Sequence, residues 1–143
     1  EVSIPSALKM NLESSLHKKY SLKYFLIGTD KQTLIKIKEN LNRLECQRIC
    51  LRLHPRYSDE KLIREIFTSY DIERPEEVAL KESFENTEYI CSLFSTVLYQ
   101  AYINDKKVCI DDISYGEKKL NELKKLRYIM MSKGVDKLSE LCL

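Results

Sequence analysis

The sequence has no long hydrophobic run, little net charge and no CxxC pair of cysteines. Its longest apolar run is far shorter than the roughly 20 residues that a membrane-spanning helix needs. The net charge of the 143 residues is +2, so the composition does not require a nucleic-acid partner. No signal peptide, internal repeat or low-complexity segment is visible. The absence of these features, together with 43% apolar and 32% charged residues, is typical of one globular domain with its own core.

The cysteines and acidic residues do not form a recognisable metal motif. None of the five cysteines belongs to a CxxC pair. Cys46 and Cys50 are close in sequence, but no second cluster completes a zinc site. The sequence therefore predicts buried free thiols in a reducing cytosol. It also lacks an acidic D-x-D cluster, so we expect neither a bound metal nor another cofactor.

Short apolar segments alternate with amphipathic segments from residue 22 onward. Each of the short apolar runs predicts a strand: residues 22–28, 48–53, 88–93 and 107–111. Helical spacing and capping residues predict helices: residues 31–44, from Ser58, from Pro75, 95–103, 116–131 and 135–141. Strands that alternate with helices form a parallel sheet buried on both sides. We therefore expect an α/β, Rossmann-like parallel sheet with helices on both faces.

Residues 1–20 do not fit this alternation. We interpret them as a linker or a helix that follows another domain upstream, and residues 21–143 as one binding domain. In open parallel sheets, ligands bind beyond the carboxyl ends of the strands, near the switch in strand order. The predicted strand ends at 28–30, 54–56 and 93–96 therefore define the expected binding edge.

His54-Pro55 stands at the second of these strand ends, in "LRLHPRYSDE". A proline pushes the residue before it into an extended conformation, which aims the imidazole outward from the strand. An imidazole with a pKa of about 6.5 can donate a proton or a hydrogen bond at neutral pH. Arg56 beside it can pair with a phosphate or a sugar carboxylate. The simpler alternative is a histidine that only caps the strand or bonds a backbone carbonyl.

Polar side chains also stand at the first and third strand ends. Ser95 and Thr96 open a predicted helix, where hydroxyl groups and unpaired backbone N–H groups together form an anion site. Capping of the helix would explain them equally well, and the two roles are compatible. Asp30 stands before the helix that follows the first strand, and capping is its simplest role.

This pattern resembles the C-terminal, nucleotide-binding half of bacterial sialyltransferases of the GT-B kind. It is most similar to glycosyltransferase family 52, the lipooligosaccharide sialyltransferases, and next to the capsular polysialyltransferases. These families carry a His-Pro motif after a strand and, later in the chain, a Ser/Thr motif at a helix start. Here the motifs are His54-Pro55 and Ser95-Thr96, the latter in "EYICSLFSTVLYQAYINDKKVCIDD". The resemblance covers roughly residues 22–115, and Arg52 departs from a lysine that is common in the family.

The resemblance implies that residues 21–143 bind a sugar donor linked to cytidine monophosphate. The donor would be CMP-sialic acid, and the reaction would transfer sialic acid to a cell-surface glycan, lipooligosaccharide or capsule. The acceptor-binding half of such an enzyme is not in this chain, so the chain is expected to be inactive alone. We expect a cytoplasmic location, and we leave open attachment of the full-length enzyme to the inner face of the bacterial membrane and a homodimer.

The resemblance also implies roles for individual residues. His54 would protonate or hydrogen-bond the departing phosphate, which Ser95 and Thr96 would hold. Asp30 would deprotonate the acceptor hydroxyl, as inverting transfer requires a base. Glu73 would accept hydrogen bonds from the cytosine or the ribose, and the alternative for it is a surface carboxylate.

Other functions remain open from the sequence. A related GT-B transferase could use CMP-Kdo or CDP-glycerol. Outside the enzymes, the alternatives are a flavodoxin-like or response-regulator-type module without chemistry and a domain that serves dimerisation. The regulator is disfavoured because Asp30 is the only acidic residue at the first strand end.

Overall fold

The computed structural model describes residues 10, 12, 18–27, 30–44, 48–93, 95–114 and 135–141. The strands are β1 (Tyr20–Phe25), β2 (Ile49–Arg52), β3 (Asp71–Glu73), β4 (Thr87–Ser92), β5 (Lys107–Ile110) and β6 (Asp136–Lys137). The helices are α1 (Lys31–Asn42), α2 (Glu60–Ile66), α3 (Leu80–Glu85), α4 (Thr96–Ile103) and α7 (Leu138–Leu141).

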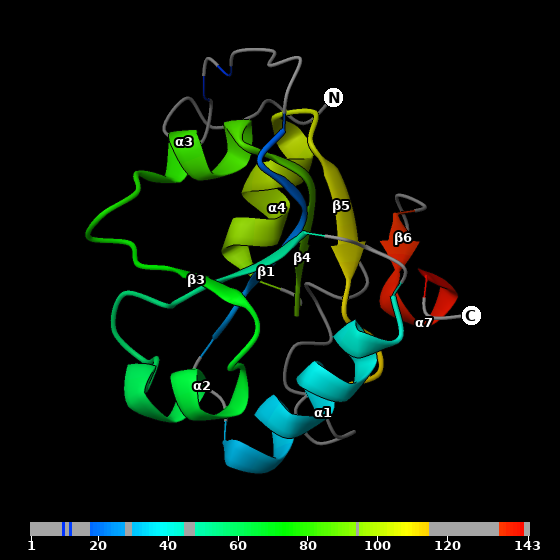
Figure 1. Ribbon diagram of the computed structural model, residues 1–143. Helices are drawn as coiled ribbons and strands as arrows, with labels where there is room; N and C mark the ends of the chain where they lie inside the picture. The colour runs from blue at the N-terminus through cyan, green and yellow to red at the C-terminus, as the bar shows by residue number, and fades with distance from the viewer. Residues whose placement is uncertain are drawn as a thin grey trace.

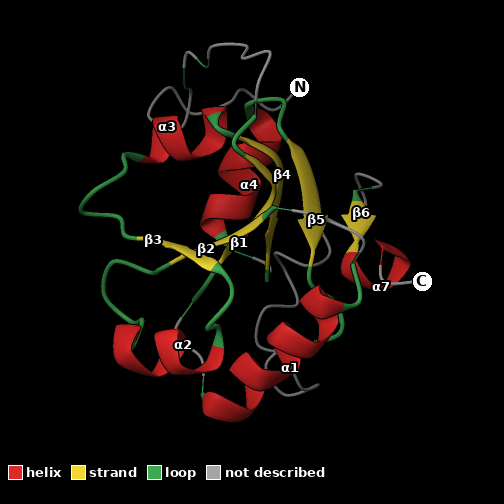
Figure 2. Ribbon diagram, viewed as in Figure 1, coloured by secondary structure: helices red, strands yellow, loops and turns green. Residues whose placement is uncertain are grey.

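The strands form one six-stranded sheet in the order β3-β2-β1-β4-β5-β6, and every pair in it is parallel. This is the strand order of the Rossmann fold. Helices α1 and α2 lie on one face of the sheet, and α3 and α4 lie on the other (Figure 1). The predicted α/β, Rossmann-like sheet with helices on both faces is confirmed. The chain reverses its direction of winding between β1 and β4, which are neighbours at the centre of the sheet (Figure 2).

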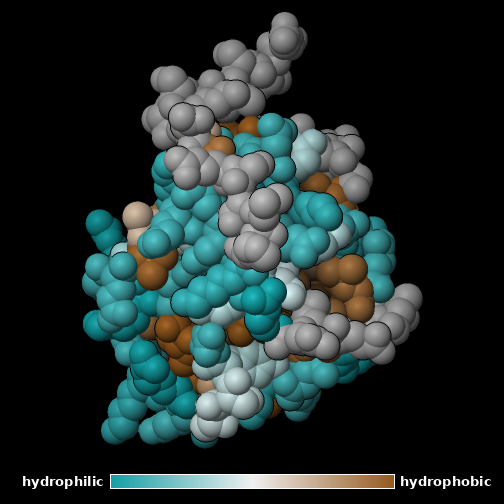
Figure 3. All heavy atoms as spheres, turned by 45° about the horizontal axis from the view of Figure 1, so that its top comes forward, coloured by the Kyte–Doolittle hydropathy of each residue, from teal (hydrophilic) through white to brown (hydrophobic). Residues whose placement is uncertain are grey.

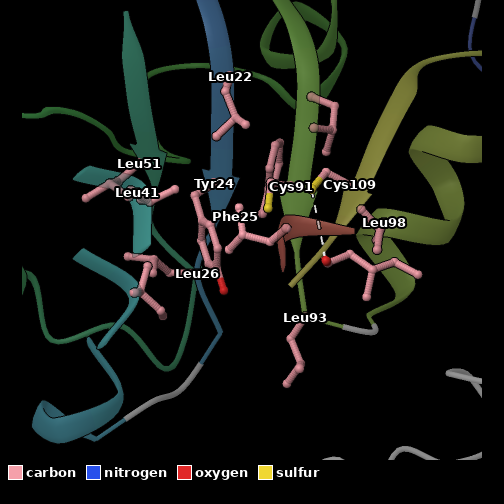
Figure 4. Close-up of a cluster of buried hydrophobic side chains, with 14 of the residues drawn as sticks. Leu22, Tyr24, Phe25, Leu26, Leu41, Leu51, Cys91, Leu93, Leu98 and Cys109 are labelled. Atoms are coloured by element: carbon pink, nitrogen blue, oxygen red, sulfur yellow. Dashed lines mark hydrogen bonds between the residues drawn. The ribbon is translucent and has the colours of Figure 1, made fainter. Parts of the chain in front are cut away.

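Strand β1 forms the centre of the core. Every residue from Leu22 to Leu26 is at most 4% exposed, and successive side chains of a strand point to opposite faces. Both faces of the sheet are therefore covered, as expected for parallel strands. Figure 4 shows Tyr24 of β1 between Leu51 of β2 and Cys91 of β4, its partners in the strand register.

The surface carries few large hydrophobic side chains. The face in Figure 3 is mainly hydrophilic, and hydrophobic residues reach the surface there in separate areas. Three large hydrophobic side chains of the described residues are exposed: Ile35, Tyr57 and Leu141. Within the described ranges, no helix is long and apolar enough to cross a membrane.

Two helix starts differ from the prediction. Helix α2 is capped by Asp59 rather than Ser58, because the Asp59 carboxylate accepts a hydrogen bond from the Leu62 amide at 3.2 Å. Helix α3 begins at Leu80 rather than Pro75, because a turn occupies residues 75–77. The side-chain hydrogen bond of Asp59 selected the later start of α2, whereas the N-cap of α3, Ala79, makes no side-chain hydrogen bond.

The bounds of two strands, one at the sheet margin and one at its centre, also differ from the prediction. Residues 136–137 form strand β6 beside β5 instead of the start of a helix over 135–141, and only 138–141 are helical. A strand of two residues has no periodicity from which it could be recognised. Strand β1 begins at Tyr20, the last residue of the predicted linker. The predicted helix at 116–131 lies outside the described residues, as does most of segment 1–20.

Three charged side chains are buried together within the sheet. They are Lys23 of β1, Arg52 of β2 and Glu73 of β3, with exposed fractions of 0%, 7% and 7%. The Lys23 Nζ atom lies 2.7 Å from Glu73 Oε1, and Arg52 Nη1 lies 2.7 Å from Glu73 Oε2. Arg52 and Glu73 are register partners, so the glutamate bridges two strands on the face that α3 covers.

Helix α3 completes the hydrogen bonding of this ion cluster. The Lys23 ammonium donates to the carbonyl and the hydroxyl of Ser83 at 3.0 and 2.9 Å, and to Asn86 Oδ1 at 2.7 Å. The Ser83 hydroxyl donates to Glu73 Oε2. Each buried charge is thus both paired and hydrogen-bonded, as burial requires.

The pKa values follow from this burial and pairing. Burial opposes ionisation of Glu73, but hydrogen bonds from Lys23, Ser83 and Arg52 outweigh it and hold the pKa of Glu73 below its usual value. Burial lowers the pKa of Lys23, and the Glu73 carboxylate offsets part of that effect. The cluster therefore stabilises an ionised glutamate beside two cations.

We expect Glu73→Gln to lower the free energy of unfolding by about 3–5 kcal/mol, because it leaves two buried cations without their counter-charge. Denaturant unfolding followed by circular dichroism measures the loss. Because the pKa of Glu73 is lowered in the folded state, its contribution is complete above the usual pKa of 4.5 and is lost as the pH falls through the lowered value.

Glu77→Gln is the matched control for this prediction. Glu77 is an exposed carboxylate that pairs with Arg74 at 2.8 Å, and such surface pairs contribute little. The unfolding midpoint of this variant should stay close to that of the wild type. Similar small losses in both variants would contradict a stabilising role for the buried ion cluster.

Candidate functional site

The carboxyl ends of β2, β1 and β4 lie next to one another in the sheet. The switch in strand order falls between β1 and β4, and open α/β sheets bind ligands in the crevice at this point. The segments that follow these strands are residues 53–59, 26–30 and 93–95, of which residues 28–29 and 94 are not described. Every predicted site residue except Glu73 lies in these segments or, for Thr96, directly after one.

His54 is held firmly at the end of β2. Its Nδ1 atom accepts hydrogen bonds from the backbone amides of Arg56 at 3.1 Å and Tyr57 at 3.3 Å. Its own amide donates to the Ser58 hydroxyl at 2.6 Å. The imidazole also stacks on the Tyr57 ring, with centroids 4.7 Å apart. The side chain of His54 thus caps the turn by accepting from backbone amides, and its ring orientation is fixed.

The hydrogen bonds of His54 also define its protonation. Because Nδ1 accepts two amides, the ring proton of the neutral form is assigned to Nε2. Burial, and then the positive charge of Arg56, lower the pKa of His54 from its usual 6.5. The imidazole is therefore neutral at neutral pH. This favours a hydrogen bond from Nε2–H to a ligand over the proton transfer that was predicted as the other option.

Ser95 stands at the end of β4 and caps α4. Its Oγ accepts a hydrogen bond from the Leu98 amide at 3.3 Å, and its hydroxyl lies 3.4 Å from that of Ser92. The Ser92 hydroxyl in turn donates to the Phe25 carbonyl at 2.8 Å, at the end of β1. The predicted capping role of Ser95 is confirmed, and this chain of hydroxyl groups joins the two strand ends that border the crevice.

Thr96 is the first residue of α4, and its side chain is exposed. In the part of the chain that the structure describes, its hydroxyl makes no hydrogen bond. The amides of Thr96 and Val97 have no acceptor within the helix, because the first amides of an α-helix precede any such acceptor. These groups and the positive end of the helix dipole can together bind an anion.

Asp30 and Arg56 differ in how far they are engaged. The Asp30 carboxylate caps α1 by accepting a hydrogen bond from the Thr33 amide at 3.2 Å, and this bond lowers the pKa of Asp30. Its capping role is confirmed, and a lowered pKa makes it a weak base; catalysis by it stays a prediction. Arg56 and Pro55 are exposed in the turn, and no ion pair of the Arg56 guanidinium occurs among the described residues.

Glu73 does not belong to this edge as a free acceptor. It is the last residue of β3 and is buried, so the expectation of a surface carboxylate is wrong. Both of its oxygens are engaged, Oε1 by Lys23 and Oε2 by Arg52 and Ser83. Glu73 therefore offers no unengaged oxygen to the candidate site, and its contact with cytosine or ribose stays a prediction.

The sequence interpretation missed two features near the strand ends. Asp111 follows β5 and is fully buried, and it accepts hydrogen bonds from the Tyr24 hydroxyl and from the amides of Ile113 and Ser114. Burial raises the pKa of Asp111. The hydrogen bonds from these donors give its carboxyl group a structural role. The other feature is Tyr57, whose exposed ring directly follows the His-Pro motif in sequence. An aromatic residue in so short a turn was a usable signal.

A cavity of about 510 Å³ lies at the opposite edge of the sheet. The amino ends of β1, β2 and β3 and the end of α1 line it with Lys19, Arg48 and Asp71 among others. The carboxyl ends of helices carry negative partial charge, so this edge is less suited to an anion than the helix starts at the other edge. We therefore place the candidate site at the carboxyl edge.

We expect the His54 imidazole to titrate with a midpoint below 6.5, because burial and the Arg56 charge disfavour its cation. NMR of the imidazole Cε1–H signal against pH measures the midpoint, and the signal is assigned by its loss in His54→Asn. Arg56→Gln should raise the midpoint part of the way. The pKa of His54 is lower in the folded state than in the unfolded state. The turn is therefore most stable above pH 6.5, and its stability falls as the pH drops through the folded-state pKa. A midpoint at or above 6.5 would contradict this geometry.

Comparison of the chain with family models, curated proteins and solved structures finds no match. The resemblance to sialyltransferases in its two motifs therefore stays a prediction, and any function has to be argued from the geometry of the carboxyl edge.

Proposed function

We propose that this domain binds the CMP portion of CMP-sialic acid at the carboxyl edge of its sheet, as the donor half of a glycosyltransferase. The transfer of sialic acid to a cell-surface glycan by the cytoplasmic full-length enzyme belongs to the same proposal. The observation that carries it is the placement of the two motifs. His54 follows β2 and Ser95-Thr96 follow β4, so they stand on either side of β1 at the switch in strand order.

The spacing of these strand ends suits a nucleotide. Strands β2 and β4 are separated by β1, which places their ends about 10 Å apart, or two strand spacings. This is the length scale of a nucleoside monophosphate. A phosphate between the two strand ends can then contact both the His54 imidazole and the start of α4.

The groups at this edge are hydrogen-bond donors of the kind that an anion needs. The Nε2–H of the neutral His54 ring, the amides of Thr96 and Val97, and the exposed Arg56 guanidinium all lack a protein acceptor among the described residues. In the proposed reaction they stabilise the negative charge that grows on the departing phosphate. His54 acts by its hydrogen bond, since its lowered pKa keeps it neutral.

Calorimetric titration of the chain with CMP tests this proposal, with CDP and UMP for comparison. We expect CMP to bind in the micromolar to millimolar range. Replacing both Ser95 and Thr96 by alanine should weaken binding by about tenfold or more, because hydrogen bonds to charged groups are worth roughly 1.5–3 kcal/mol. His54→Asn should also weaken binding, since its side-chain oxygen can replace Nδ1 in the turn but no donor replaces Nε2–H.

Two exposed arginines give a matched control that separates the two edges of the sheet. Arg56→Gln removes a cation at the carboxyl edge, and Arg48→Gln removes one at the amino-edge cavity. Only the first should weaken CMP binding. The absence of binding to any of the nucleotides would refute the proposal, and loss of binding in Arg48→Gln alone would move the site to the amino edge.

A further inference from the structure

Tyr57 is the most exposed of the three large hydrophobic side chains at the surface of the described chain. Its exposed fraction is 66%, compared with 38% for Ile35 and 37% for Leu141. Among the described residues, its ring stacks on one other aromatic ring, that of His54, with an interplanar angle of 28°. One face of the phenol ring therefore rests on the imidazole, and the ring remains largely open to solvent at the carboxyl edge of β2.

The stack is held in place although it lies in an exposed turn. The His54 ring is fixed by two backbone amides, one of which is the amide of Tyr57 itself. Pro55 restricts the backbone between them, and the Ser58 hydroxyl holds the start of the turn. An aromatic surface that is already ordered loses little conformational freedom when a ligand stacks on it.

We propose that Tyr57 is the stacking platform for the nucleobase of the ligand, with His54 as the support beneath it. This inference rests on the proposed nucleotide site and adds to it the residue that holds the base. The base lies on the open face of Tyr57, and the phosphate lies over the end of β1, between the His54 imidazole and the amides of Thr96 and Val97.

The chemistry of stacking determines what this platform can select. A tyrosine face attracts any planar base through dispersion and burial of apolar area, so it provides affinity for a nucleoside without reading base edges. The platform therefore distinguishes a nucleotide from a sugar phosphate, whereas the choice of cytosine depends on other groups.

Binding of CMP and of ribose 5-phosphate to wild type and variants tests the inference. Tyr57→Ala and Tyr57→Leu should weaken CMP binding by about tenfold, because stacking on one aromatic side chain has that order of effect. Both variants should bind ribose 5-phosphate as the wild type does. Tyr57→Phe keeps the ring and should bind both ligands normally. In the NMR spectrum, the cytosine H5 and H6 signals should move upfield with the wild type and with Tyr57→Phe only.

The outcomes separate this inference from the proposed function. Unchanged CMP affinity in Tyr57→Ala and Tyr57→Leu, or equal losses for CMP and ribose 5-phosphate, would overturn the platform while leaving the nucleotide site intact. The platform would also be overturned if the wild type bound ribose 5-phosphate as tightly as CMP. If the wild type binds neither ligand, the nucleotide site itself is refuted, and the platform is refuted with it.

Discussion

The buried ion cluster of Lys23, Arg52 and Glu73 is the constraint on which the rest of this sheet depends. Removing a charge from water costs several kcal/mol, and only partners in good geometry offset that cost. Here the partners come from β1, β2 and β3, and Ser83 and Asn86 of α3 provide the remaining acceptors. A shift of any strand by one residue would turn its charge to the other face and leave the others unpaired. The cluster thus specifies one register for half of the sheet.

That register determines where the candidate site lies. Arg52 is anchored to Glu73 at 2.7 Å, and His54 follows it by two residues along the same strand end. The position of the imidazole at the carboxyl edge is therefore set by charges buried inside the sheet. On the other side of β1, the hydrogen bond from Ser92 to the Phe25 carbonyl holds β4 in register and so positions the start of α4.

Structural and proposed ligand-binding roles are compatible at this edge because they use different atoms. His54 holds its turn with Nδ1 and leaves Nε2–H for a ligand. Ser95 caps α4 with its hydroxyl, whereas the hydroxyl and amide of Thr96 have no partner among the described residues. Tyr57 rests one face on His54 and exposes the other. The proposed anion site consists of a neutral histidine, helix amides and an exposed arginine, and it needs no buried charge, in contrast to the cluster within the sheet.

The sequence by itself determined the fold class and the edge of the sheet at which His54, Asp30 and Ser95 stand, because periodicity and capping are local properties. The tertiary structure alone decided which charges are buried. Lys23, inside the apolar run of β1, and Glu73, at the end of β3, are far apart in sequence, and no local pattern pairs them. The same holds for β6, which is a strand only because β5 lies beside it. The tertiary structure also decided the protonation of His54, since the pKa of His54 depends on burial and on the charge of Arg56.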